Sequence, residues 1–141
     1  MTARAALALL GVFALTGCGE LRRECDAVVK RANAFLAESA SHRPAPGAPP
    51  ERAAEEARST AARYEKLAAD LAALDVKSGD LKPEVERYRE LAQRSAASLK
   101  AAAHALETKH FEQARSERVA LDRASKSEAP LVARINEICK D

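Results

Sequence analysis

Apolar residues recur at helical spacing through most of the chain, and three interruptions divide them into four segments. Residues 42–50 hold four of the six prolines and cannot be helical, because proline removes a helix hydrogen bond. Residues 77–80 (KSGD) predict a turn, with Gly79 as the C-cap of one helix and Asp80 as the N-cap of the next. A fainter break at 108–110 contains neither glycine nor proline.

Each of the first three segments carries a stripe of apolar or small residues three or four positions apart, which favours amphipathic helices. The first stripe consists of Leu21, Cys25, Val28, Ala32 and Phe35, widened by Val29 and Leu36. The second contains Ala57, Tyr64 and Leu71 together with Thr60, Leu67 and Leu74. The third contains Val85, Ala92, Leu99 and Leu106 together with Leu81, Tyr88, Ser95 and Ala102.

The fourth segment is less regular. Arg118 interrupts a stripe of Phe111, Ala114 and Leu121, and Pro130 precedes a stripe of Leu131, Val132, Ile135 and Ile138. Ser127 is placed to cap a separate final helix with Pro130 in its first turn. The alternative is one helix that kinks at Pro130.

These segments predict an all-α protein, an elongated antiparallel bundle of about four helices. Helices of roughly 20 to 30 residues would be ~30 to 45 Å long. If the break at 108–110 is absent, the last two helices fuse and the bundle has three long helices instead.

Composition supports this fold and narrows the function. The 141 residues include many alanines, five Phe and Tyr and no Trp, so small side chains must supply the packing. Few glycines and few β-branched residues exclude a β-sandwich or barrel. With 23 basic and 21 acidic residues, the chain lacks the basic excess of a nucleic-acid binder, and no nucleic-acid partner is expected.

Residues 1–17 differ from the rest of the chain. They contain no acidic residue, Arg4 is their one basic side chain, and Ala5 to Leu15 is apolar apart from Gly11. That run is shorter than the ~20 residues that span a bilayer. A basic start, a short apolar run and small residues after it predict a secretory signal peptide.

The end of this run, Leu15-Thr16-Gly17-Cys18, resembles the lipobox of bacterial lipoproteins. The resemblance implies cleavage before Cys18, a diacylglyceryl thioether and an amide-linked acyl chain such as palmitate on Cys18, and a mature domain of residues 18–141. Several acyl chains at ~0.8 kcal/mol per methylene hold a protein firmly on a membrane. Gly19 in place of the aspartate of inner-membrane lipoproteins implies the outer membrane of a Gram-negative host, facing the periplasm or the cell surface. The alternatives are an ordinary signal before a buried Cys18, or an uncleaved apolar helix.

Cys25 and Cys139 are the other two cysteines. In an up-down-up-down bundle the first helix starts where the fourth ends, so the two thiols would be neighbours. Export would place them in an oxidising compartment, and we expect an intramolecular disulfide worth ~4 to 5 kcal/mol. Two buried free thiols or an intermolecular bridge are the alternatives.

Motifs for catalysis are missing from the sequence. There is no haem-attachment motif, no glycine-rich phosphate loop and no G-x-S-x-G. Glu107 and His110 form one Glu-x-x-His, whereas a di-iron bundle needs two such motifs and two further glutamates. We therefore expect no catalytic residue, metal or cofactor, and interpret Tyr64 and Tyr88 as core tyrosines whose hydroxyls reach an edge.

Three functions are compatible with this sequence. The first is a membrane-tethered, non-catalytic binding or structural module that engages an envelope protein, the cell wall or a second copy of itself. An apolar groove on the side of the bundle would strengthen it. The second is a carrier or enzyme with an internal cavity of ~300 Å³ or more, for which an alanine-packed core should be too narrow. The third is an amphipathic bundle that opens onto lipid.

Overall fold

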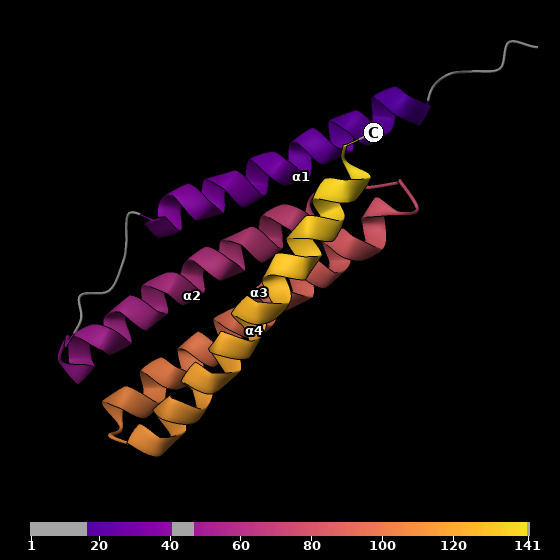
Figure 1. The fold of residues 1–141 in the computed structure, drawn as a ribbon. Coiled ribbons are helices and arrows are strands. Elements are labelled where there is room, and N and C mark those ends of the chain that lie inside the picture. The colour runs from indigo at the N-terminus through magenta and orange to yellow at the C-terminus, as the bar shows by residue number, and fades with distance from the viewer. Residues whose placement is uncertain (1–16, 41–46, 141) are drawn as a thin grey trace, which may run out of the picture.

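The structure, a computed structural model, describes residues 17–40 and 47–140, and for Gly17 and Cys18 it describes the backbone alone. This part of the chain folds into four helices and contains no strand (Figure 1). The helices are α1 (Gly17–Ala40), α2 (Pro50–Ala72), α3 (Leu81–Glu107) and α4 (Phe111–Ile138). The all-α prediction is confirmed. Residues 1–16 of the predicted signal peptide and the predicted modification of Cys18 lie outside what the structure describes.

The faint break at 108–110 separates α3 from α4, so the alternative of three long helices is wrong. The His110 N–H donates to the Ala105 carbonyl at 2.8 Å and the Lys109 N–H to the Leu106 carbonyl at 3.2 Å. This double pattern is a Schellman motif, which requires a left-handed residue after the helix cap. Lys109 takes that conformation, with φ of 60°. The sequence signal is faint because the position usually held by glycine is a lysine.

The turn predicted at 77–80 is part of a longer connection. Helix α2 already ends at Ala72 and is closed by Ala73, so Gly79 as its C-cap is wrong. Asp80 does precede α3, but its side chain makes no capping hydrogen bond. Its backbone is helical, with φ of −85° and ψ of −36°, whereas a capping residue needs an extended backbone. Pro50 does occupy the first turn of α2, as its position predicts.

Helix α4 runs without a break from Phe111 through Pro130 to Ile138, so the separate helix capped by Ser127 is wrong. The Ser127 hydroxyl instead donates to the Arg123 carbonyl one turn earlier, at 3.0 Å. Ile135 is the one buried residue of α4. Phe111, predicted on the inward stripe, is 53% exposed, so the first half of α4 does not bury its stripe.

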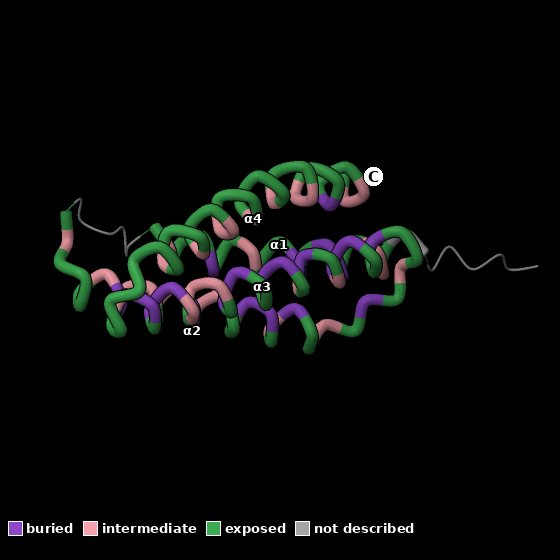
Figure 2. The backbone as a smooth tube through the Cα atoms, turned by 90° about the horizontal axis from the view of Figure 1, so that it is seen from below, coloured by how far each residue is buried: buried purple, intermediate pink, exposed green. Residues whose placement is uncertain are grey.

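Small residues line the seam where α2 meets α3, the most extensive helix contact, which is followed by that of α3 with α4. Ala54 and Ala61 of α2 and Ala103 and Ala105 of α3 are fully buried, and Figure 2 shows buried residues along both helices. Alanine lets helix backbones approach closely, so the seam is tight without large side chains. Helix α1 contacts α2 over a smaller area. Helices α1 and α4 do not pack along their length.

Candidate binding groove

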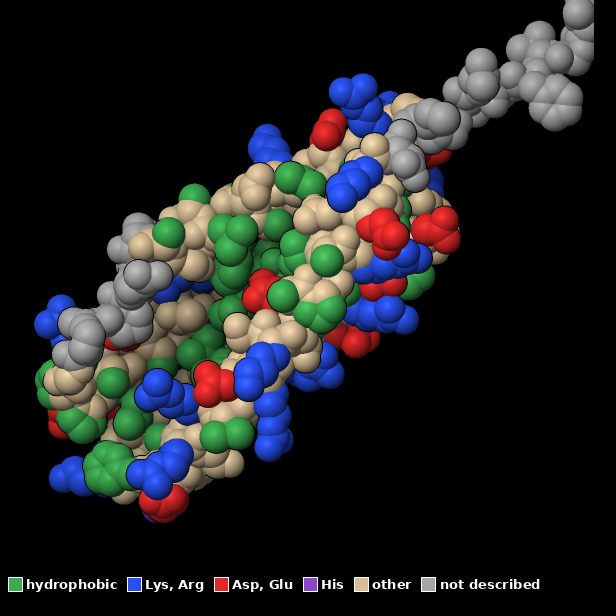
Figure 3. Space-filling view, in the orientation of Figure 1, with side chains coloured by type: hydrophobic (Ala, Val, Ile, Leu, Met, Phe, Trp, Pro, Cys, Tyr) green, Lys and Arg blue, Asp and Glu red, His purple; other side chains and the backbone are tan. Residues whose placement is uncertain are grey.

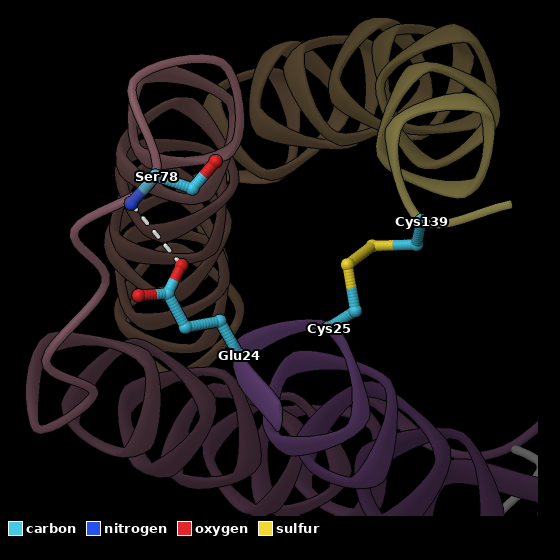
Figure 4. The surroundings of a disulfide bond; sticks show 4 residues. All are labelled: Glu24, Cys25, Ser78 and Cys139. Carbon is cyan, nitrogen blue, oxygen red and sulfur yellow. Dashed lines mark hydrogen bonds between the residues drawn. A yellow bond between two sulfur atoms is a disulfide. The ribbon is translucent and has the colours of Figure 1, made fainter. Parts of the chain in front are cut away.

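A disulfide joins the start of α1 to the end of α4. The Cα atoms of Cys25 and Cys139 lie 5.6 Å apart, well within the range that the bond allows, and the residues are 114 positions apart in sequence (Figure 4). The predicted intramolecular bond is confirmed. The two alternatives, buried free thiols and an intermolecular bridge, are wrong. The bond closes one end of the seam between α1 and α4.

Glu24 fixes the same part of α1 to the connection between α2 and α3. Its carboxylate accepts the backbone N–H of Lys77 at 2.8 Å and that of Ser78 at 3.2 Å (Figure 4). The Ser78 carbonyl in turn accepts the Lys82 N–H at 2.9 Å. Ser78 therefore lies directly before the first turn of α3 and is bonded to it. Glu24 is 8% exposed, and these bonds satisfy two backbone donors of the connection that precedes α3. The amphipathic pattern of α1 gave no sign of this role.

Away from the disulfide, α1 and α4 separate and leave a groove of about 620 Å³. Figure 3 shows it as a hollow with a hydrophobic floor. Helix α1 contributes Val28, Val29, Ala32 and Leu36. Helix α4 contributes Ala129, Val132, Ala133 and Ile135. Val29 and Leu36, predicted to widen the core stripe, are 37% and 55% exposed because they face this groove.

The groove is a cleft on the side of the bundle and not an internal cavity, so the expectation that an alanine-packed core is too narrow for such a cavity stays a prediction. The two outer helices are tied to each other at one end only, so they do not close over the floor beneath them. The space is open to solvent along one side, as the apolar groove of a binding module would be (Figure 3).

Glu128 supplies the one charge among the thirteen residues that line the groove. Its side chain is half-buried and accepts a hydrogen bond from the Tyr88 hydroxyl at 3.1 Å. Within residues 19–40 and 47–140, it forms no ion pair with any Lys, Arg or His. A carboxylate in apolar surroundings with no cationic partner is the most unusual feature of this surface.

Aromatic rings gather around Glu128. The rings of Phe35 and Tyr64 are in contact, with centroids 4.7 Å apart, and Tyr88 lies in the same core. Burial, and then the charge of Glu128, raise the pKa of the Tyr88 hydroxyl well above its ordinary value. The same two causes, in the same order, raise the pKa of Tyr64. Both phenols are therefore neutral, and Tyr88 is the hydroxyl that reaches an edge, as expected from its stripe.

Sequence reasoning missed Glu128, although a signal for it exists. Glu128 is seven residues after Leu121 and seven before Ile135, so it falls on the inward stripe of α4. A charged residue on such a stripe is either paired or placed beside a cavity. The many charged residues around it concealed the signal, because most of them lie on solvated faces.

A second cleft, of about 440 Å³, lies between α3 and α4 and contains Arg87, Arg94 and Arg134. Its charges are largely compensated. Arg87 pairs with Glu84 at 3.0 Å, and Arg134 pairs with Glu137 at 2.7 Å. The arginines of both pairs are more than half exposed, so the pairs belong to a solvated edge of the cleft and define no site.

The single Glu-x-x-His motif has other contacts. Glu107 pairs with Arg58 of α2, and the Nδ1 atom of His110 lies 2.7 Å from the Thr108 hydroxyl. In the part of the chain that the structure describes, no three His, Cys, Asp or Glu side chains gather closely enough to hold a metal ion. None of the helices in residues 17–40 and 47–140 has the length and apolar character that crossing a bilayer requires.

Comparison of the chain with protein-family models, with curated proteins and with solved structures finds no match.

Proposed function

We propose that this protein is an exported, lipid-anchored binding module of the bacterial cell envelope that holds its ligand in the groove between α1 and α4. The groove is the observation that carries the proposal. It is apolar, open along one side and contains a carboxylate without a cationic partner. Contiguous exposed apolar surface is typical of binding sites in soluble domains. No catalytic step is part of the proposal.

The anchor rests on the resemblance of residues 15–18 to a lipobox, which assigns the acyl chains to Cys18. Because α1 is continuous from Gly17, residues 28–36 lie ten to eighteen positions beyond Cys18 on the same helix. At 1.5 Å per residue this places the groove ~15 to 27 Å along α1 from the acylated residue. Such a separation would hold the groove clear of the bilayer and open to a ligand outside the cytoplasm.

A carrier for a small molecule is a second candidate, and it uses the same groove. The volume of about 620 Å³ falls within the ~300 to 1,000 Å³ of small-molecule sites. The nature of the occupant separates this function from that of a module that binds an envelope protein or a second copy.

Labelling of host cells with a palmitate analogue tests the anchor. We expect the wild-type protein to incorporate the label and to sediment with membranes, and the Cys18→Ser protein to do neither. Equal labelling of the two proteins, or recovery of an unlabelled wild-type protein with residues 1–17 intact, would contradict the lipoprotein assignment.

Native mass spectrometry of the protein purified from its host envelope tests the groove. We expect a bound mass on the wild-type chain that is lost in Ala133→Phe, which fills the groove, and kept in Ala62→Phe on the exposed face of α2. A bound mass that Ala133→Phe retains, or a wild-type chain with nothing bound, would count against the groove as the site.

A further inference from the structure

We infer that the groove between α1 and α4 selects a small organic cation, an apolar molecule with one ammonium or guanidinium group that pairs with Glu128. The inference rests on the proposed function, since it names the ligand class of the same groove.

The charge of the ligand follows from Glu128. It is the one formal charge that lines the groove, and within the described residues no basic side chain pairs with it. A carboxylate in a largely apolar groove attracts a cation more strongly than a fully solvated carboxylate does, because the local dielectric is lower. Tyr88 donates to Oε1, which orients the carboxylate and leaves Oε2 for a donor on the ligand.

The aromatic side chains favour a cation further. Tyr88 lines the groove, and Phe35 and Tyr64 pack together in the core that adjoins it. Tyr88 is the one aromatic residue among those that line the groove, and its ring is the one that a ligand there can contact. Aromatic rings attract ammonium and guanidinium groups electrostatically, and a nearby carboxylate adds to that attraction.

The size of the groove favours a small molecule over a partner protein. Thirteen residues line it, whereas each side of a stable protein interface has ~20 to 30. Val29 and Leu36 of α1 face Val132 and Ala133 of α4 across it and offer apolar walls for the body of the ligand. The neutral side chains of Asn33 and Asn136 complete the lining without adding charge.

The test uses three probes with the same tail: hexyltrimethylammonium, hexanol and hexanesulfonate. Each is titrated into the purified lipoprotein in dodecyl maltoside micelles, which contain neither an ammonium group nor a second protein. The chain has two tyrosines and no tryptophan, and Glu128 influences both tyrosines, so tyrosine emission and the tyrosine ring NMR signals report on this site. We expect the cation to bind about tenfold more tightly than the other two probes.

Glu128→Gln should remove this preference, and Asp122→Asn should keep it. Asp122 is an exposed acid on the same helix outside the groove, so it controls for net charge. If Glu128→Gln does not fold, the order of the three probes on the wild-type chain still decides the question.

If the wild-type chain binds the three probes equally and Ala133→Phe blocks that binding, the inference of a cationic ligand is wrong and the groove remains a binding site. Binding that Ala133→Phe does not change would count against the proposed function itself. The last part of the experiment titrates a helical peptide that has one lysine among apolar residues. If it binds at the groove where hexyltrimethylammonium does not, the occupant is a protein segment and the small-molecule inference is wrong.

Discussion

Glu24 of α1 accepts the backbone N–H of Lys77 at 2.8 Å and so joins two segments 53 residues apart in sequence. The carboxylate is almost wholly buried and also receives the Ser78 N–H. It therefore anchors the connection that precedes α3 to α1, whereas the Asp80 side chain makes no capping hydrogen bond.

Glu24→Ala should lower the free energy of unfolding by about 2 to 3 kcal/mol, because it leaves two backbone donors without their charged acceptor. Urea denaturation measures this loss, and faster amide exchange at Lys77 and Ser78 locates it. Asp26→Ala, an exposed acid on the same turn, is the control and should change stability by less than about 0.5 kcal/mol. Equal effects of the two substitutions would show that the two hydrogen bonds of Glu24 contribute nothing to stability.

Cys139→Ser should destabilise the fold by about 5 kcal/mol in the chain-entropy model, because the disulfide joins residues 114 positions apart. Helix α1 should respond most, since its packing against α2 is the least extensive of the main helix contacts. Thermal unfolding with and without a reductant, together with amide exchange in α1, measures both effects. The reductant should leave Cys139→Ser unchanged, and a wild-type melting temperature that is insensitive to it would contradict the prediction.

Lys109→Gly should stabilise the protein by about 0.5 to 1 kcal/mol. The left-handed backbone at φ of 60° costs a residue with a Cβ atom free energy that glycine does not lose. Lys109→Ala is the matched control, because it removes the charge and keeps the Cβ atom. Urea midpoints of the three proteins measure their stabilities. An equal gain in stability in Lys109→Ala would assign the effect to the loss of charge.

Alkaline pH should weaken the fold through Tyr88. Its folded-state pKa is raised above the ordinary value of 10 by burial and by the Glu128 charge. The folded protein therefore keeps the phenol proton more tightly than the unfolded chain does. The stabilisation is complete below pH 10 and declines as the pH rises from 10 towards the folded-state pKa.

Tyr88→Phe removes this titration, so its stability should fall less steeply than that of the wild type between pH 9 and pH 11. Urea midpoints across that range measure the two slopes, and lysine titration affects both proteins alike. Parallel slopes would show that the phenol of Tyr88 ionises as readily in the folded protein as in the unfolded chain.

The local pattern was sufficient to predict the four helices and the position of the disulfide. Both follow from stripes and breaks that a single segment carries, and from the alternation of helix direction. The prediction that Gly79 caps α2 was wrong, because contacts from outside the turn hold the connection to α3. Glu24 bonds to it from α1, and its own Val76 is buried.

The groove could not be predicted for a similar reason. The stripe of α1 shows that Val29 and Leu36 are apolar, but it does not show that α4 leaves them uncovered. That separation depends on where the two helices are tied, which is a property of the tertiary fold. The pairing of Tyr88 with Glu128, 40 residues apart, depends on it as well.

The Cys25–Cys139 bond encloses most of the chain in a covalent ring that contains all three connections between helices. A protease that cuts one peptide bond inside this ring therefore releases no fragment. The nicked protein keeps its full mass on a non-reducing gel and separates into two pieces only after a thiol is added.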